Sequence, residues 1–337
     1  MKAMVLRAPH DLGLEDVERP RPGHGQVLVR VTNSGICGTD LKIYDGAVPV
    51  RHPLIMGHEM SGEVVEGGDD RVRPGDYVIV DPCLYCGVCI NCRAGQTSLC
   101  RNGGLVGRDS NGGFAEYLLA PLTHVFVLPK EVDRQKAPLI QVLTTCIHAQ
   151  RFLNIFPGQS VAVMGLGVTG QLHVQLAKAH GANPVMGITR STWKRQLAKE
   201  LGADLTLSSG AEARRGVLDA TNGQGADVVI ESTGTLPGIS DAISMCRLGA
   251  TLHLFGVTTA TGGDLPFYQL YYKELKIFNS RAANGEDFPV AIDLVAKGMV
   301  KLGPLVTHLV PLAELSSAIH MLETDADHRM KVILEHN

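Results

Sequence analysis

The chain has 337 residues, of which 45% are hydrophobic and 19% are charged. This length exceeds one ordinary hydrophobic core, so two domains are expected, and the composition excludes general disorder. The formal net charge of −3 gives no electrostatic signature of a nucleic-acid partner or of an anionic membrane surface.

No apolar run reaches the roughly eighteen residues of a membrane-spanning helix. The N-terminal segment MKAMVLRAPHDLGLEDVERP lacks the apolar core of a signal peptide. Export is therefore not expected, and the sequence predicts a cytoplasmic protein.

The first part of the chain predicts a β-rich domain, which we place at residues 1–152. Short apolar runs at Gln26–Val31, Gly62–Val65 and Tyr77–Val80 are separated by Gly, Pro and Asp, as is typical of strands joined by turns. The turn sequence Arg73–Asp76 directly precedes the third run and has the chemistry of a strand entry.

A candidate metal site lies within this domain. Cys37, His58 and Glu59 supply a thiolate, an imidazole and a carboxylate, which together suit a borderline-soft divalent metal such as zinc. The glycines of Gly57–Gly62 allow a tight turn and close approach of the chain, and Thr39–Asp40 follow the cysteine closely. Each residue alone is more often a packed core residue. Their combination predicts a catalytic metal.

Five of the eight cysteines lie between positions 83 and 100. In a small secreted chain they would predict disulfides, whereas Cys-x-x-Cys spacing in a larger, unexported chain predicts metal binding. We assign Cys86, Cys89, Cys92 and Cys100 to a structural zinc, because four thiolates leave no open coordination position. Cys83 is left out, because the regular triplet and a returning cysteine make a compact lobe (83–100). A zinc ribbon for nucleic acid is the competing interpretation, and the scarcity of basic and aromatic neighbours opposes it.

From Ser160 a repeated order of strand, glycine turn and helix predicts an α/β domain with a doubly wound parallel sheet. We place it at residues 153–283 and expect residues 284–337 to return to the first domain. The predicted segments are Val161–Met164, Gln171–His180, Val185–Thr189, Trp193–Leu201, Asp204–Leu207, Val228–Glu231 and Thr251–Phe255, followed by a helix at Phe288–Lys297 and a strand at Met330–Glu335.

The sequence Gly165-Leu166-Gly167-Val168-Thr169-Gly170 joins the first of these strands to a helix. In that position each of Gly165, Gly167 and Gly170 has a mechanical role: a tight turn, close approach to a pyrophosphate, and packing of helix on strand. Val168 and Thr169 would begin the helix whose N-terminus faces the phosphates. The alternative is a glycine-rich turn without a ligand.

The next strand ends at Thr189, where an NAD site would carry an acidic residue for the ribose 2′-hydroxyl. Arg190 follows instead, with Lys194 and Arg195 one turn later. Arg190 could pair bidentately with a 2′-phosphate, so the sequence predicts NADP as the cofactor, with NAD the alternative. For Lys194 and Arg195, an equally good interpretation is that they lie on a solvated helix face and bind no cofactor.

With these motifs in order, the chain resembles the zinc-containing medium-chain alcohol and polyol dehydrogenases over essentially its whole length. The resemblance rests on Gly57–Val64, the four-cysteine lobe, Gly75-Asp76 and the glycine loop. It implies a GroES-like catalytic domain, a Rossmann coenzyme domain, and two zinc ions per chain. It also implies reversible hydride transfer between an alcohol carbon and nicotinamide, with zinc acting as a Lewis acid. A homo-dimer or homo-tetramer is implied as well.

By resemblance, Cys37 and His58 bind the catalytic zinc, and Glu59 can enter or leave its coordination. Thr39 begins a proton relay, and Asp40 orients His58. Two positions depart from the family pattern. The usual third protein ligand is Gln141, a weaker neutral donor, and the usual relay histidine is Lys42, which could carry a proton only with a depressed pKa.

The substrate is less well specified by the sequence. Asn279–Asn284 followed by Phe288-Pro289 resembles the sugar-acid and polyol branch, in which Arg281 and Asn284 would bind hydroxyls or a carboxylate; ordinary loop polarity is the equal alternative. We expect an NADP(H)- and zinc-dependent oxidoreductase acting on a secondary alcohol, namely a polyol, sugar or sugar acid. The alternatives are a reductase of an unrelated small carbonyl compound and a relative that binds NADPH and zinc without turnover.

Overall fold

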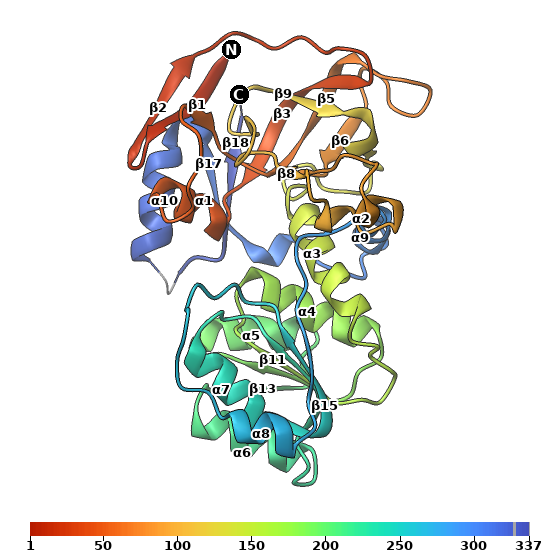
Figure 1. Cartoon of the computed structure of the whole chain (residues 1–337), viewed down its shortest axis with the longest axis vertical. Coiled ribbons are helices and arrows are strands. Elements are labelled where there is room, and N and C mark those ends of the chain that lie inside the picture. The colour runs from red at the N-terminus through yellow and green to blue at the C-terminus, as the bar shows by residue number, and fades with distance from the viewer. Residues whose placement is uncertain (326–327, 337) are drawn as a thin grey trace. The chain divides into compact units, whose positions relative to one another are not determined.

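The computed structural model describes residues 1–325 and 328–336, and the chain forms two compact units (Figure 1). Unit 1 comprises Met1–Thr144, Ala282–Gly298 and Leu302–Asn337, and unit 2 comprises Thr145–Arg281 and Met299–Lys301. The first boundary, after Thr144, lies within a helix and precedes the predicted end of the first domain at residue 152. No helix in the described part of the chain has both the length and the apolar character needed to cross a bilayer.

Unit 1 is built mainly from strands. Its largest sheet has the order β10-β6-β5-β3-β18-β17, with β9 also paired to β3; a second sheet has the order β2-β1-β4, and β7 pairs with β8. The strands are β1 Lys2–Ala8, β2 Asp11–Asp16, β3 Gln26–Gly35, β4 Leu54–Ile55, β5 Glu59–Gly67, β6 Tyr77–Val80, β7 Cys83–Leu84, β8 Gly104–Leu105, β9 Tyr117–Pro121, β10 Val125–Val127, β17 Val306–Pro311 and β18 Lys331–Glu335.

The long strand β3 organises this unit because it pairs antiparallel with β5, β9 and β18. Alternate residues Val27, Val29 and Val31 point to one face and join a core cluster with valines of β5 and β6. The pairing of β18 with β3 brings the C-terminal part of the chain into the sheet formed by its N-terminal part.

Helices cover the remaining surface of unit 1 at several places. They are α1 Gly38–Tyr44, α2 Ile90–Arg93, the start of α3 Leu139–Arg151, α9 Asp287–Ala296 and α10 Leu315–Thr324, with short 3₁₀ turns at Thr97–Leu99, Leu122–His124, Gly303–Leu305 and Leu312–Glu314.

Unit 2 contains one parallel sheet with the order β13-β12-β11-β14-β15-β16. Its strands are β11 Val161–Met164, β12 Val185–Ile188, β13 Leu205–Leu207, β14 Ala226–Glu231, β15 Cys246–Leu254 and β16 Lys276–Phe278. Its helices are the remainder of α3, α4 Val168–Ala179, α5 Thr192–Glu200, α6 Ala211–Ala220, α7 Leu236–Met245 and α8 Phe267–Tyr272.

The sequence of β11 explains why helices lie on both faces of this sheet. Val161 and Val163 join a core cluster with residues of α4 and α5, whereas Ala162 and Met164 join a separate cluster with residues of α6 and α7. A strand that is apolar at every position buries both of its faces. The strand order reverses between β11 and β14, and ligands of such sheets bind at the carboxyl ends of the strands near that point.

Candidate active site

The first candidate site lies where β3 ends and β5 begins. Gly35 pairs with Glu59 in the antiparallel register of these strands, so Cys37, two residues beyond Gly35, comes close to His58. One ligand atom from each of Cys37, His58 and Glu59 lies within 4.8 Å of the others. His58 and Glu59 are buried and Cys37 is partly exposed. The register thus brings together the three residues that the sequence predicts as a metal group.

Asp40 fixes two parts of this group. It lies fully buried in α1, and its Oδ2 accepts a hydrogen bond of 2.8 Å from the backbone N–H of Cys37. Its Oδ1 is 3.3 Å from Nδ1 of His58. Burial opposes protonation of His58, but the charges of Asp40 and Cys37 outweigh it and raise the pKa of His58 well above its usual value. The proton belongs on the side of Asp40, which leaves the other ring nitrogen of His58 as the ligand atom.

Glu59 has a partner that sequence reasoning missed. Nζ of Lys331, in β18, lies 2.6 and 2.9 Å from the two carboxylate oxygens of Glu59 and donates a third hydrogen bond of 3.0 Å to the carbonyl of Ile36. Lys331 is only 4% exposed and Glu59 only 1%. A Cβ atom on Gly35 would lie 2.1 Å from Oε2 of Glu59, so glycine is required beside this pair. The available signal was a lysine within the apolar strand-like run Met330–Glu335.

The other predicted residues lie on two helices. Thr39 and Lys42 are partly buried in α1, and Gln141 is buried in the first turn of α3. Within the described residues the Lys42 side chain makes no hydrogen bond or ion pair. Their part in proton transfer or in metal binding stays a prediction.

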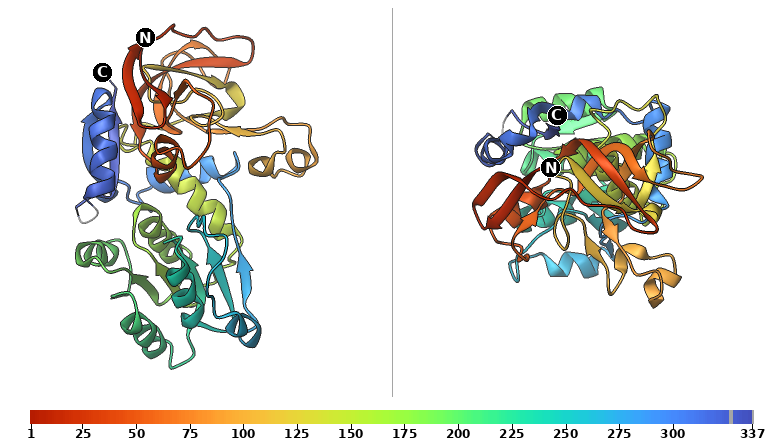
Figure 2. Two further views of the ribbon diagram at one scale, coloured as in Figure 1. Left: turned by 60° about the vertical axis from the view of Figure 1, so that its left-hand side comes forward. Right: turned by 90° about the horizontal axis from the view of Figure 1, so that it is seen from above.

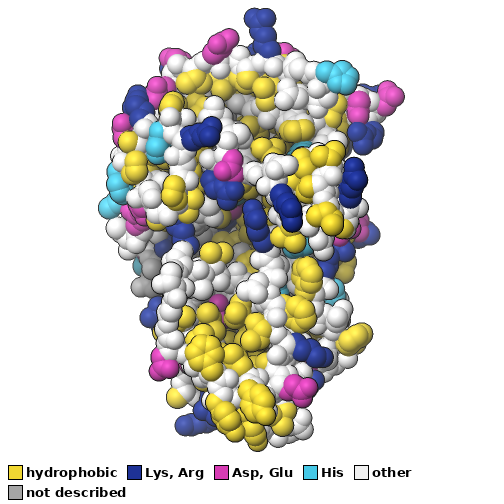
Figure 3. Space-filling view, in the orientation of Figure 1, with side chains coloured by type: hydrophobic (Ala, Val, Ile, Leu, Met, Phe, Trp, Pro, Cys, Tyr) yellow, Lys and Arg dark blue, Asp and Glu magenta, His cyan; other side chains and the backbone are white. Residues whose placement is uncertain are grey.

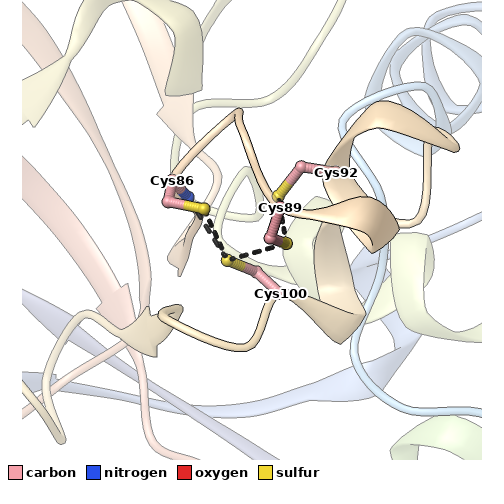
Figure 4. Close-up of side chains that lie close together, drawn as sticks. All are labelled: Cys86, Cys89, Cys92 and Cys100. Atoms are coloured by element: carbon pink, nitrogen blue, oxygen red, sulfur yellow. Dashed lines mark hydrogen bonds between the residues drawn. The ribbon is translucent and has the colours of Figure 1, made fainter.

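The second candidate site is the four-cysteine lobe, which projects from the strands of unit 1 (Figure 2). The four sulfurs converge (Figure 4), with Sγ–Sγ distances of 3.5 Å for Cys89–Cys92, 3.9 Å for Cys89–Cys100 and 3.5 Å for Cys86–Cys100. Backbone N–H groups of Cys92 and Arg101 lower the pKa of the Cys89 thiol to about 6, which favours the thiolate that a metal binds. Cys83 lies outside the group, buried in β7.

Asn284 holds the lobe from the C-terminal part of unit 1. Its side-chain oxygen accepts hydrogen bonds from the backbone N–H of Ser98, at 3.0 Å, and from the hydroxyl of Thr97, at 3.2 Å. Its own backbone N–H donates to Asp287. Asn284 is buried, which favours a structural role for its polar group over contact with substrate. Arg281, its predicted companion, is exposed and belongs to unit 2.

The third candidate site is the glycine loop of unit 2. Gly165 has φ +90°, and a Cβ atom on Gly170 would lie only 1.8 Å from the carbonyl oxygen of Gly165. Gly167 is the N-cap residue of α4, and Val168 begins that helix. The hydroxyls of Thr169 and Ser232 are 2.8 Å apart, which ties α4 to the end of β14. The loop therefore has the open backbone and the helix N-terminus that a pyrophosphate requires.

The two predicted cofactor arginines differ in their contacts. Arg195 donates 2.8 Å hydrogen bonds to the carbonyls of both Thr189 and Arg190 and a longer one to Thr192, so it braces the loop after β12. The Arg190 side chain is exposed and has no ion-pair or hydrogen-bond partner among the described residues. An unpaired guanidinium at the end of β12 can bind a phosphate group.

Known proteins resemble this chain along most of its length. The family profile described as alcohol dehydrogenase GroES-like domain matches residues 23–130, and the profile described as zinc-binding dehydrogenase matches residues 168–297. L-threonine 3-dehydrogenase of Pyrococcus abyssi is 33% identical over 314 residues, 90% of each chain. Sorbitol dehydrogenase of Halalkalibacterium halodurans is 31% identical over 332 residues, 96% of each chain. The chain belongs to the zinc-containing medium-chain alcohol/polyol dehydrogenase family.

A solved structure extends this similarity to three dimensions. A zinc-binding dehydrogenase of Sinorhizobium meliloti bound to NADP has a TM-score of 0.92 and 32% identity, covering 99% of this chain and 98% of that chain. The present chain therefore combines a GroES-like domain with a Rossmann domain, and it is a zinc- and NAD(P)-dependent oxidoreductase.

The donor atoms of this medium-chain dehydrogenase fit zinc. Four sulfurs around a tetrahedral zinc at about 2.3 Å lie about 3.8 Å apart, close to the 3.5–3.9 Å separations in the lobe. Cys37, His58 and Glu59 supply fewer than four protein donors, which matches a site that keeps a position open for substrate.

Proposed function

We propose that this dehydrogenase transfers hydride reversibly between NADP(H) and a secondary alcohol or ketone, with a polyol, sugar or sugar acid as substrate. The observation that carries the proposal is the convergence of Cys37, His58 and Glu59 within 4.8 Å, with Asp40 beside His58 and Lys331 paired to Glu59. A sorbitol dehydrogenase that is 31% identical along nearly the whole chain supports the substrate class.

In this proposal Cys37 and His58 hold the catalytic zinc, and Glu59 or Gln141 completes its protein ligands. A second zinc is held by Cys86, Cys89, Cys92 and Cys100, giving two per chain. The catalytic zinc would supply Lewis-acid polarisation of the substrate oxygen, which lowers the pKa of an alcohol. Asp40 keeps the His58 ring oriented, and Lys331 neutralises Glu59 while that carboxylate stands back from the metal.

We propose that the Thr39 hydroxyl accepts the proton of the substrate alcohol and passes it on. The next carrier is Lys42, because it lies in the same helix and its side chain has no hydrogen bond or ion pair among the described residues. Water is the alternative carrier. Loss of the proton at oxygen and of hydride at carbon together convert the alcohol to the carbonyl compound.

We propose NADP as the preferred cofactor. Gly165, Gly167, Val168, Thr169 and Gly170 would bind the pyrophosphate. Thr189 and Arg190 would meet the adenosine ribose, with Arg195 holding their backbone in place. The unpaired Arg190 guanidinium and the NADP bound in the Sinorhizobium meliloti relative support this preference.

The chain is further proposed to form a homo-oligomer through α8 and β16. Tyr268 and Tyr271 of α8 are 73% and 82% exposed, and in Figure 3 hydrophobic side chains gather over this helix. β16 is an edge strand of its sheet, and an exposed apolar edge strand favours pairing with a second copy of the chain. Light scattering should give at least twice the chain mass for the native protein and a smaller mass for Tyr271→Asp. An unchanged mass of the variant would contradict this interface.

A cytoplasmic location is part of the same proposal. None of the eight cysteines forms a disulfide in the described structure, and thiolate metal ligands persist in a reducing compartment.

The proposal is tested by initial rates on a panel of alcohols, polyols and sugar acids with NADP and NAD in parallel, before and after treatment with a chelator. Chelator-sensitive oxidation that prefers NADP is expected. Absence of any turnover, with NADPH still bound, would instead make this chain a relative that binds its cofactor without catalysis, with Gln141 and Lys42 as the altered positions.

A further inference from the structure

A polar recess of about 670 Å³ lies within unit 1, apart from the residues of the metal group. It is lined by the chain segment 49–54 and by residues of 103–111, among them Arg51, Arg108, Ser110 and Asn111. Two arginines from distant parts of the sequence therefore border one hollow. We call it the polar recess.

The polar recess adjoins the segment that carries His58. Backbone N–H groups of Gly112–Phe114 donate to the carbonyls of Ile55–Gly57 at 2.7–3.0 Å. A Cβ atom on Gly107 would lie within 2.5–2.8 Å of the backbone of Gly57. One wall of the recess is thus fixed against the residues directly before His58, and the other wall continues into them along the chain.

The polar side chains that line the recess are donors, apart from the carboxylate of Asp109. Oδ2 of Asp109 accepts from Nε and Nη2 of Arg108, at 3.0 and 2.6 Å, and from the backbone N–H of Leu105. This holds the Arg108 guanidinium in place and leaves its other N–H groups to donate. Oδ1 of Asn111 accepts from the N–H of Ile55 at 3.1 Å, which leaves the amide NH₂ group to donate.

Arg51 adds a charge that nothing nearby neutralises. It is exposed, and within the described residues its side chain has no carboxylate partner. Asp109 cancels the charge of Arg108, so the recess carries one net positive charge together with guanidinium, amide and hydroxyl donors. Such a set binds a carboxylate or a phosphate group, because a guanidinium pairs with either through two parallel hydrogen bonds.

We propose that the polar recess binds the anionic end of the substrate, so that this dehydrogenase acts on a polyol carrying a carboxylate or a phosphate. This inference rests on the proposed function and narrows its substrate class. The reacting hydroxyl carbon lies at the metal group, and Arg51, Arg108 and Asn111 hold the charged terminus. Arg51 is a specificity-determining residue in this arrangement.

The test compares kcat/KM of native protein, Arg51→Ala and Arg51→Lys on sorbitol, on sorbitol 6-phosphate and on gluconate. Arg21→Ala is the matched control, because Arg21 is exposed in the same unit and lies outside the recess. Because Arg51→Ala removes a charged hydrogen-bonded pair, it should lower kcat/KM at least tenfold on the anionic substrates and less than twofold on sorbitol. Arg51→Lys should recover part of the loss, and the two anionic substrates distinguish phosphate from carboxylate.

An equal effect of Arg51→Ala on sorbitol and on its phosphate would overturn the inference, as would no effect. If the native protein oxidises none of these compounds, the proposed function fails separately, and inorganic phosphate then serves as the probe. Calorimetric titration of phosphate into NADPH-saturated protein should give at least tenfold weaker binding for Arg51→Ala than for Arg21→Ala. Equal binding by the two variants would contradict the recess as an anion site.

Discussion

The carboxylate of Glu59 is buried beside a candidate metal, and its charge needs a partner. Lys331 supplies one through two short contacts, and the carbonyl of Ile36 holds the lysine in place. An isolated buried carboxylate is costly, so the pair matters chiefly because neither charge tolerates the loss of the other.

Removing Lys331 should therefore destabilise the folded protein. We expect Lys331→Met to lower the free energy of unfolding of unit 1 by about 3–5 kcal/mol, measured by urea denaturation. The double variant Glu59→Gln, Lys331→Met should recover much of this loss. Lys2→Met is the control, because it breaks an ion pair with Asp16 that is exposed and therefore adds little to stability. Equal losses for Lys331→Met and Lys2→Met would show that the buried pair is not needed.

Arg190 offers a second test at this scale. Its guanidinium has no internal partner in the described structure, so Arg190→Ala should leave the fold unchanged. We expect NADPH to bind at least tenfold more weakly, because a charged pair contributes about 1.5–3 kcal/mol, while NADH binding changes less than twofold. Fluorescence titration measures both affinities. A parallel loss for the two cofactors would place the 2′-phosphate elsewhere.

At the scale of elements, local patterns in the sequence predict local structure well. β6 and β11 have the predicted bounds, Tyr77–Val80 and Val161–Met164, because continuous apolar runs bounded by Gly, Pro or Asp leave few alternatives. β15 begins at Cys246 instead of the predicted Thr251. Its start has the alternation of a strand, with apolar Cys246, Leu248 and Ala250 separated by Arg247 and Gly249, so the sequence held a signal that the prediction did not use.

Long-range pairings explain what the sequence could not predict. The proximity of Cys37 to His58 follows from the register of β3 against β5, which no local pattern encodes. Lys331 reaches Glu59 across 272 positions of the chain. Asn284 likewise reaches Ser98 from a distant segment. The sequence supplied the ligand types through their spacing, whereas the groups that brace them come from tertiary structure.

The cysteine lobe is an element that depends on its metal. Its helix α2 has only four residues and buries none of them, so little hydrophobic packing supports it. We expect Cys89→Ser to lower the apparent Tm by several degrees and to remove about one zinc per chain while the Cys37 site keeps its own. Thermal melts with metal analysis check this. Ala94→Ser, at the exposed end of the same helix, is the control, and a Cys89→Ser protein as stable as this control would contradict a structural zinc.

At the scale of the whole molecule, unit 2 contains buried histidines that link stability to pH. His173 and His253 are fully buried on α4 and β15. Burial, and then the neighbouring His253, lowers the pKa of His173 to about 3. Burial, and then His148, lowers the pKa of His253 to about 4. Both rings pack against the aromatic ring of Phe255, an apolar neighbour that favours the neutral imidazole.

The lowered pKa values of His173 and His253 make the folded protein less stable at acidic pH. Below an unfolded-state pKa of about 6.5, the unfolded chain binds protons that the folded chain does not, so stability falls as the pH drops from 6.5 toward 4. Each imidazole lowers the free energy of unfolding by at most about 1.4 kcal/mol per pH unit. Burial raises the pKa of Asp81 to about 7, so protonation of this carboxyl stabilises the folded state as the pH falls. This opposite effect is present in every variant compared below.

We therefore expect His173→Leu, His253→Leu to lose less stability than native protein between pH 7 and pH 5. Urea denaturation followed by a unit 2 probe, Trp193 fluorescence, measures the slope. His24→Gln is the control, because His24 is exposed. Identical slopes for the double variant and the control would contradict the burial of neutral imidazoles.

The most direct test of the central claim is the zinc content of Cys37→Ser, measured together with its rate of NADP-dependent alcohol oxidation. The native protein should hold two zinc ions per chain, and the variant one. Oxidation by the variant should fall at least a thousandfold, a loss of about 4 kcal/mol of transition-state stabilisation, while NADPH binding is retained. A variant that keeps two zinc ions, or that keeps its activity with one, would contradict catalysis at the Cys37–His58–Glu59 group.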